Sequence, residues 1–195
     1  MIYLNQLDYP YMLYHTNTDD PTDISRKNGT VRKSGCGLCS SVMVADRLLT
    51  DYSFTLTDAI HLSYDTGANH AIGTDYKIYA PAFAEKLGFK LEMTSDPERV
   101  LYCLHTGGAV VAHVSGNREG YTGVFSTGGH YIAVISADDN GRVAVLDPSY
   151  KEGKYDIEGR AGKVDVKGVV CYCDISVLVE DTKNRTPSFY LFWKK

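Results

Sequence analysis

The sequence lacks long apolar runs, basic clusters and internal repeats. Although 44% of its 195 residues are hydrophobic, no apolar run approaches the roughly 20 residues that a membrane-spanning helix needs. Its formal net charge is −4, from 24 acidic residues against 20 lysines and arginines that are scattered along the chain. A nucleic-acid surface needs clustered cations to neutralise phosphates. We therefore expect no membrane span and no nucleic-acid partner.

An export signal and a disulfide framework are also missing. Met1–Gln6 has neither the charged nor the apolar region of a signal peptide. The five cysteines are an odd number, which favours reduced thiols over paired ones. We expect a cytoplasmic protein, or a secreted one if an export signal has been removed.

No linker rich in proline, glycine or serine divides the chain, and its length suits one core. We expect a single domain over residues 1–195. Helical periodicity dominates the first half and strand-like runs dominate the second half, an order that is typical of an α+β fold.

Four helices are expected after a polar, extended arm, Met1–Lys33. In the first helix, Gly37–Leu49, apolar side chains recur at helical spacing. The other three are expected at Thr57–Tyr64, at Ile78–Leu87 with Gly88 as its stop, and after Asp96-Pro97, an N-cap followed by a proline.

Five or six strands are expected to pack against these helices. Asn140-Gly141 favours a two-residue hairpin turn, which predicts that Tyr131–Ile135 and Val143–Leu146 pair antiparallel. The other strand candidates are Ala109–Val114, Val169–Cys173, Ser176–Val179 and Phe189–Trp193.

Cys36 stands at the predicted start of the first helix. The helix dipole and the free backbone N–H groups of a first turn stabilise a thiolate, the reactive form of cysteine. Gly35 and Gly37 leave the approach to the sulfur open. The same pattern also fits a plain turn before a buried helix.

His130 and Asp147 are predicted at neighbouring strand ends. His130 follows Gly128-Gly129 and opens one strand of the hairpin, and Asp147 ends the other, before Pro148. Ends of paired strands lie close together, so the carboxylate is placed to accept the imidazole Nδ1–H. Aspartate before proline is also an ordinary strand terminator.

Four short motifs place glutamine, cysteine, histidine and aspartate in this order along the chain: Asn5-Gln6-Leu7, Ser34-Gly35-Cys36-Gly37, Gly128-Gly129-His130-Tyr131 and Leu146-Asp147-Pro148. In this order the chain resembles the papain superfamily, and more narrowly the C39-like bacterial cysteine peptidases, relatives of the bacteriocin-processing double-glycine peptidases. The resemblance implies a papain-like fold, with the nucleophile helix packed on an antiparallel sheet. It also implies that Cys36 is the nucleophile and His130 its base, that Asp147 orients the histidine, and that Gln6 joins the Cys36 backbone N–H in an oxyanion hole.

The implied activity is that of a cysteine peptidase that cleaves peptide or protein substrates through a thioester, without cofactor or metal. An amine can replace water at the thioester, so transamidase and isopeptidase activities stay open. The oligomeric state is not predicted. The sequence departs from the family at Cys39, where relatives usually carry a small or polar residue, and in the spacer between Gln6 and Cys36, which is longer than in papain.

Three alternatives remain. Cys36 and Cys39 form a C-x-x-C pair that suits redox chemistry, but the polar segment before it is not the apolar strand of a thioredoxin. The same pair with Cys171 and Cys173 offers four sulfurs to zinc, although C-x-C more simply puts two thiols on one strand face. A papain-like binding module without turnover is the third, against which the complete cysteine, histidine and aspartate set argues.

The remaining histidines have no partner at a recognisable spacing: His15, His61, His70, His105 and His113. Surface or satisfied-core roles are expected for all five. Only His113, at the end of an apolar strand, is placed to approach the cleft.

Overall fold

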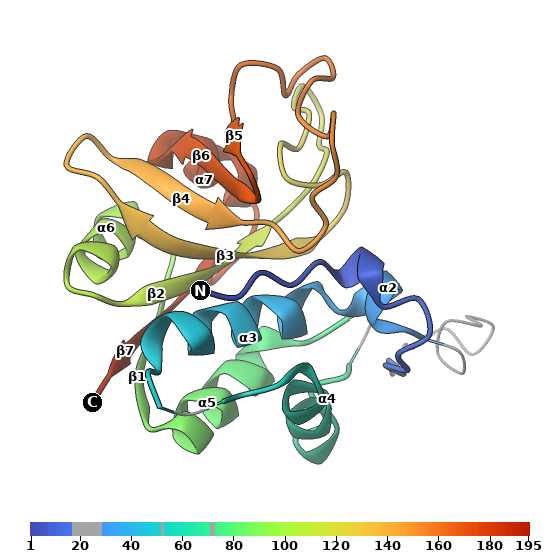
Figure 1. The fold of residues 1–195 in the computed structure, drawn as a ribbon. Coiled ribbons are helices and arrows are strands. Elements are labelled where there is room, and N and C mark those ends of the chain that lie inside the picture. The colour runs from blue at the N-terminus through green and yellow to red at the C-terminus, as the bar shows by residue number, and fades with distance from the viewer. Residues whose placement is uncertain (17–28, 52, 71–72) are drawn as a thin grey trace.

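A computed structural model describes residues 1–16, 29–51, 53–70 and 73–195 (Figure 1). Part of the predicted arm Met1–Lys33 therefore lies outside the described residues. One antiparallel sheet has the strand order β1-β7-β2-β3-β4-β6-β5. Its strands are β1 (Phe89–Thr94), β2 (Ala109–Val114), β3 (His130–Ala137), β4 (Arg142–Leu146), β5 (Asp165–Lys167), β6 (Val170–Asp174) and β7 (Phe189–Lys194).

The helices begin and end close to their sequence signals. They are η1 (Gln6–Asp8), α2 (Val31–Ser34), α3 (Cys36–Leu48), α4 (Leu56–Asp65), α5 (Tyr76–Leu87), α6 (Pro97–His105) and α7 (Ile175–Thr182). At α4, Thr55 and Asp58 form a reciprocal capping box. At α6, the Asp96 side chain accepts from the backbone N–H of Glu98. Gly88 ends α5 with φ 68°, a left-handed conformation that glycine adopts without strain.

Both faces of the sheet are covered by helices (Figure 1). In β2, alternate side chains enter two cores: Val111 packs with the buried residues of α3, α4 and α5, and Val110 with those of α6 and α7. Because every second side chain of a strand points to the same face, these central strands read as continuous apolar runs. The α+β prediction is confirmed, with helices on both sides of the sheet.

One predicted strand is wrong. Ser176–Val179 belongs to helix α7, whose N-cap Asp174 accepts from the backbone N–H of Ser176. Leu178, Asp181 and Thr182 are the buried residues of this helix, and their three- and four-residue spacing is helical. The valines and isoleucine of the segment favour a strand intrinsically, but the N-cap and the packing of this face override that preference.

The prediction of five or six strands is too low, because the described residues form a sheet of seven. The two that were missed, β1 and β5, are the edge strands. Each is exposed along part of its length, so neither forms the apolar run by which the central strands are recognised.

The hairpin between β3 and β4 pairs antiparallel as predicted, but its turn is longer. The Asp138 backbone N–H donates to the Arg142 carbonyl at 2.9 Å, so the loop between them is Asp139–Gly141 rather than two residues. Gly141 takes φ 78° and supplies the left-handed position of this longer loop. The Asp138 carboxylate also accepts from the Arg142 N–H, which favours closure one residue later.

The N-terminal arm lies against the segment that follows β4. Gln6 donates its backbone N–H to the Pro148 carbonyl at 2.7 Å. Tyr3 donates its hydroxyl to the Asp147 carbonyl at 2.8 Å, and the Asn5 amide donates to the Tyr150 carbonyl at 2.7 Å. These bonds bring the first residues of the chain to the end of β4.

Candidate functional site

Cys36 is the first residue of α3 and is partly exposed. The turn before it is tight: a Cβ on Gly35 would lie 2.5 Å from Val31 Cγ1. On the other side, a Cβ on Gly37 would lie 2.9 Å from the Tyr76 ring, whose hydroxyl donates to the Gly37 carbonyl. Both glycines are therefore required by close approach, and together they fix the path of the chain through Cys36.

The Cys36 thiol lies beside the imidazole of His130, the first residue of β3. Burial alone would raise the pKa of the thiol. The hydrogen bond and the charge of His130 outweigh burial, and backbone hydrogen bonds at Tyr131 and Gly37 add to them, so that the pKa is lowered. The arrangement favours a thiolate, the nucleophilic form.

His130 is bonded to Asp147 through Nε2, at 2.8 Å from Oδ1. The predicted bond from Nδ1 to the carboxylate is therefore wrong, because the structure uses the other ring nitrogen. Because Nε2 is taken by Asp147, Nδ1 is the ring nitrogen left for the Cys36 side. Burial would lower the pKa of His130, but its bonds with Asp147 and Cys36 raise the pKa to about 9.

Asp147 is fully buried and both of its carboxylate oxygens are occupied. Oδ1 accepts from the backbone N–H and the hydroxyl of Ser149, at 2.9 and 3.1 Å, besides His130. Oδ2 accepts from the Tyr155 hydroxyl at 2.6 Å and pairs with the Lys154 ammonium. Burial would raise the pKa of Asp147, but His130 and Lys154 hold it well below its usual range.

Lys154 was missed by sequence reasoning. It is 9% exposed, a rare degree of burial for lysine. Its ammonium bonds Asp147 and donates to the Ser149 hydroxyl at 2.7 Å. Local sequence offers no signal for it, because Lys151-Glu152-Gly153-Lys154 reads as a polar surface turn.

Gln6 lies near this cluster but points elsewhere. Its amide Nε2 donates to the Arg32 carbonyl at 2.8 Å, and its Oε1 is buried without a hydrogen-bond partner among the described residues. Among the described residues, neither atom bonds Cys36. The amide has a second N–H, which the bond to Arg32 leaves free.

Cys39 stands one turn after Cys36 and is completely buried. Burial and the neighbouring Cys36 raise its pKa, the opposite of the effect on Cys36. All five cysteines are free thiols, and no group of three or more possible metal ligands occurs within the described ranges. Of the predicted site residues, then, Cys36, His130 and Asp147 lie in one connected cluster, and Gln6 lies at its edge.

A hollow of about 470 Å³ opens beside the thiol. This thiol hollow is lined by Cys36, His70, Gly73, Thr74, Asp75, His113, Gly129, Tyr131 and Arg185. His113, expected to approach the cleft, does line it, and so does His70. The His113 ring stacks on Tyr131 with centroids 4.2 Å apart. Burial and the Arg185 charge lower the pKa of His113 to about 3, so it is neutral at physiological pH.

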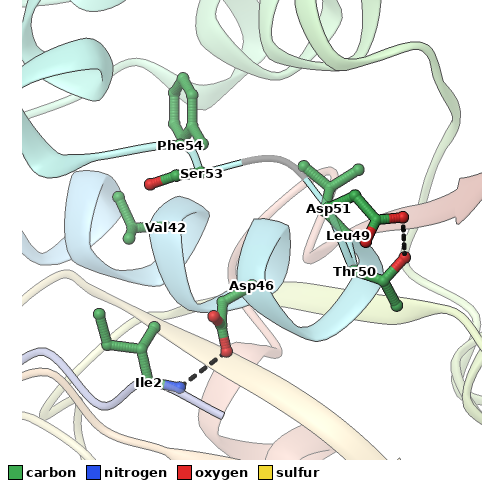
Figure 2. A pocket seen from close by; sticks show the side chains of 8 residues that line it. All are labelled: Ile2, Val42, Asp46, Leu49, Thr50, Asp51, Ser53 and Phe54. Atoms are coloured by element: carbon green, nitrogen blue, oxygen red, sulfur yellow. Dashed lines mark hydrogen bonds between the residues drawn. The ribbon is translucent and has the colours of Figure 1, made fainter.

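A different hollow lies toward the C-terminal end of α3 (Figure 2). It measures about 360 Å³ and is lined by Ile2, Val42, Asp46, Leu49, Thr50, Asp51, Ser53 and Phe54. The Ile2 backbone N–H donates to Asp46 there, at 2.7 Å. Asp46 follows Cys36 by ten residues, about 15 Å along a helix. With neither thiol nor imidazole in its lining, this hollow is separate from the cluster.

The sequence matches no protein-family model and no curated protein. Solved structures do match. The peptidase domain of Streptococcus ComA, a bifunctional ABC transporter involved in a quorum-sensing pathway, is 14% identical with a TM-score of 0.51, over 94% of this chain and 100% of that one. A putative C39-like peptidase from Bacillus anthracis is 11% identical with a TM-score of 0.52, over 83% of this chain and 88% of that one. At such identities the likeness concerns the fold, and at that level the expected resemblance to C39-like peptidases is confirmed. None of the described helices is both long and apolar enough to cross a bilayer.

Proposed function

We propose that this chain, which has the fold of C39-like peptidase domains, is a cysteine peptidase that hydrolyses peptide or amide bonds. One observation carries the proposal. The partly exposed Cys36 thiol lies beside His130, whose Nε2 is held by the buried Asp147 carboxylate. Thiol, base and orienting carboxylate in contact are the requirements of nucleophilic acyl transfer.

In the proposed reaction the Cys36 thiolate attacks the substrate carbonyl carbon and a C–S bond forms. The carbonyl electron pair becomes an oxyanion, which the Cys36 backbone N–H and the free N–H of the Gln6 amide are proposed to stabilise. As the oxyanion collapses, the C–N bond breaks and protonated His130 gives its proton to the leaving amine. Water, deprotonated by His130, then attacks the thioester, and the acid is released with the thiolate restored.

The proposal takes residues 1–195 as one peptidase domain. The sheet supports this, because it joins strands from Phe89 to Lys194 while the N-terminal arm is bonded to the segment after β4. Substrates are proposed to be peptides or proteins. They would enter the thiol hollow, which reaches Cys36 and both neighbours of His130.

The other uses of these cysteines find less support. A redox pair needs both thiols reactive, but Cys39 is fully buried and its pKa is raised. A silent binding module would not need the lowered thiol pKa or the buried carboxylate behind the histidine. Whether water or an amine resolves the thioester is decided by experiment.

The test is incubation with a diverse peptide library, with products identified by mass spectrometry. The wild type should generate defined new termini, and Cys36→Ala and His130→Ala should generate none while keeping the fold. Cys39→Ala is the matched control, because it removes a thiol one turn away, and it should still cleave. Cleavage by Cys36→Ala at the wild-type rate would refute the mechanism. Products joined to added amines would identify a transamidase.

A further inference from the structure

A basic hollow lies next to the Asp147 cluster. It measures about 250 Å³ and is lined by Leu7, Phe125, Ser126, Thr127, Ser149, Lys151, Lys154 and Arg160. Three of these residues are cationic, three carry hydroxyl groups and none carries a carboxylate. A site of that composition attracts an anion and can hydrogen-bond it.

Arg160, which lines this hollow, has an unused donor. Its side chain is held by the Gly123 carbonyl, 2.8 Å from Nε, and by the Lys154 carbonyl, 3.3 Å from Nη1. Arg160 is only 5% exposed, and its buried Nη2 has no hydrogen-bond partner among the described residues. A buried donor without a partner costs stability, and Arg160 therefore keeps hydrogen-bonding capacity beside the hollow that the described residues do not use.

The charge of the hollow is not cancelled from within. Lys154 pairs with Asp147, but neither Arg160 nor Lys151 forms an ion pair in the part of the chain that the structure describes. Lys151 is exposed and Arg160 is buried. The hollow thus combines a buried guanidinium in its wall with an exposed ammonium at the surface.

Ser149 connects this hollow to the proposed chemistry. Its hydroxyl lies 3.1 Å from His130 Nε2 and 2.7 Å from Lys154 Nζ. The thiol hollow instead reaches Cys36, Gly129 and Tyr131. The basic hollow is thus lined by a residue that contacts His130, and the thiol hollow by the two residues that flank it. Two hollows on different sides of one histidine suit the two parts of a cleaved substrate, with the acyl part on the thiol side and the leaving part on the Ser149 side.

We propose that the basic hollow binds a carboxylate in the leaving segment of the substrate, through Arg160 and Lys151. The inference rests on the proposed cleavage at Cys36 and adds a substrate class to it. An aspartate or glutamate side chain and the terminal carboxylate of a short leaving peptide present the same group.

Kinetics on matched peptides test the proposal. A cleaved peptide from the library is remade with Glu or Gln as the first leaving residue, each as free acid and as C-terminal amide. The wild type should prefer Glu over Gln in the amides if it binds a side chain, or either free acid over its amide if it binds the terminus. Equal kcat/KM across all four peptides would overturn the proposal.

Variants locate the preference. Lys151→Met should reduce the preference ratio by about threefold, the scale of an exposed ion pair, and Arg160→Met by about tenfold, the scale of a buried charged hydrogen bond. Lys86→Met, an exposed lysine of α5, should keep the wild-type ratio. An unaltered ratio in folded Lys151→Met and Arg160→Met proteins would refute the assignment. If Arg160→Met does not fold, Lys151→Met alone decides.

A binding measurement separates this inference from the proposed activity. The Cys36→Ala protein is titrated with acetyl-Gly-Glu-Gly-amide, acetyl-Gly-Gln-Gly-amide and acetyl-Gly-Gln-Gly as free acid, and backbone amides are followed by NMR. At least one of the two peptides that carry a carboxylate should shift the amide signals of Ser126, Thr127 and Ser149, and the uncharged peptide should not. Identical spectra with all three peptides would sink the inference even if the library shows cleavage. Selective shifts without any cleavage in the library would show carboxylate binding at the basic hollow and would overturn the proposed function instead.

Discussion

Asp147 is shared between His130 and Lys154. Its Oδ1 lies 2.8 Å from His130 Nε2, and its Oδ2 pairs with the buried Lys154 ammonium. A carboxylate held between two cationic partners is fixed in position from both sides. Lys154 counters part of the carboxylate charge, and the bond to Asp147 still helps to raise the pKa of His130.

The Asp147–Lys154 pair should show strong energetic coupling. Removing Asp147 leaves the buried Lys154 ammonium without a counter-ion, and removing Lys154 takes one of its two cationic partners from Asp147. Breaking a buried pair typically costs about 3–5 kcal/mol. We therefore expect Asp147→Asn and Lys154→Met each to lower the free energy of unfolding by about 3 kcal/mol. The double variant should lose much less than the sum, because no unpaired charge is left. Denaturant unfolding of the four proteins measures this, and strictly additive losses would contradict the pairing.

The reactivity of Cys36 should depend on pH through His130. The lowered thiol pKa means that alkylation by iodoacetamide stays fast in mildly acid solution, where an ordinary thiol is protonated. In His130→Ala only burial and the backbone groups act on the thiol, so its pKa should rise and labelling under mildly acid conditions should fall by more than about tenfold. Mass spectrometry of the labelled peptide gives the rate of alkylation. Equal rates in the two proteins would show that His130 does not lower the pKa of the Cys36 thiol.

The titration of His130 should set the alkaline limit of turnover. Protonated His130 must donate to the leaving amine, and its pKa is raised to about 9. As pH rises through about 9 the imidazolium loses its proton, so kcat/KM should decline there. Enzyme assays across this range, with unfolding followed in parallel, distinguish the titration from loss of structure. A decline centred near the ordinary histidine pKa would contradict the hydrogen bonds that support the imidazolium.

Sequence reasoning predicted the parts of the fold whose signals are local. The helix that begins at Cys36, the capped start of α6 and the apolar strand β2 all follow from neighbouring residues. It failed at α7, where an Asp174 N-cap and a buried face decide against the strand preference of the side chains. It could not find Lys154 either, because a polar turn residue becomes buried only when a distant carboxylate, here Asp147, requires a partner.

The ring orientation of His130 marks the same limit within the site. Spacing brings His130 and Asp147 to adjoining strand ends, but the ring nitrogen that meets the carboxylate depends on the side-chain rotamer. The Ser149 hydroxyl lies 3.1 Å from Nε2 and so also contacts the nitrogen on the Asp147 side of the ring. The Gln6 side chain is a second example: its motif predicts a role beside Cys36, but its amide donates to the Arg32 carbonyl.

Gly35 should tolerate no side chain. A Cβ there would meet Val31 Cγ1 at 2.5 Å and the Val31 carbonyl at 2.6 Å, and the backbone carbonyl cannot move aside. Gly35→Ala should therefore lower the free energy of unfolding by about 1–3 kcal/mol and slow alkylation of Cys36. Gly128→Ala is the control, since nothing lies within 4 Å of its Cβ position, and should change stability by less than about 0.5 kcal/mol. Equal stability losses in the two variants would show that the turn before α3 is not close-packed.

Gln6→Ala tests the proposed oxyanion donor. If the free N–H of the Gln6 amide stabilises the transition state, kcat should fall by about 10²-fold while KM changes little, because the donor is used only when the oxyanion forms. The Asn5→Ala variant is the matched control: it removes an amide from the same arm, bonded to the Tyr150 carbonyl at 2.7 Å. If Gln6 only secures the arm through Arg32, both variants should lose stability and turnover in parallel. A selective loss of kcat in Gln6→Ala, with unfolding unchanged from that of Asn5→Ala, would assign the amide to the chemistry.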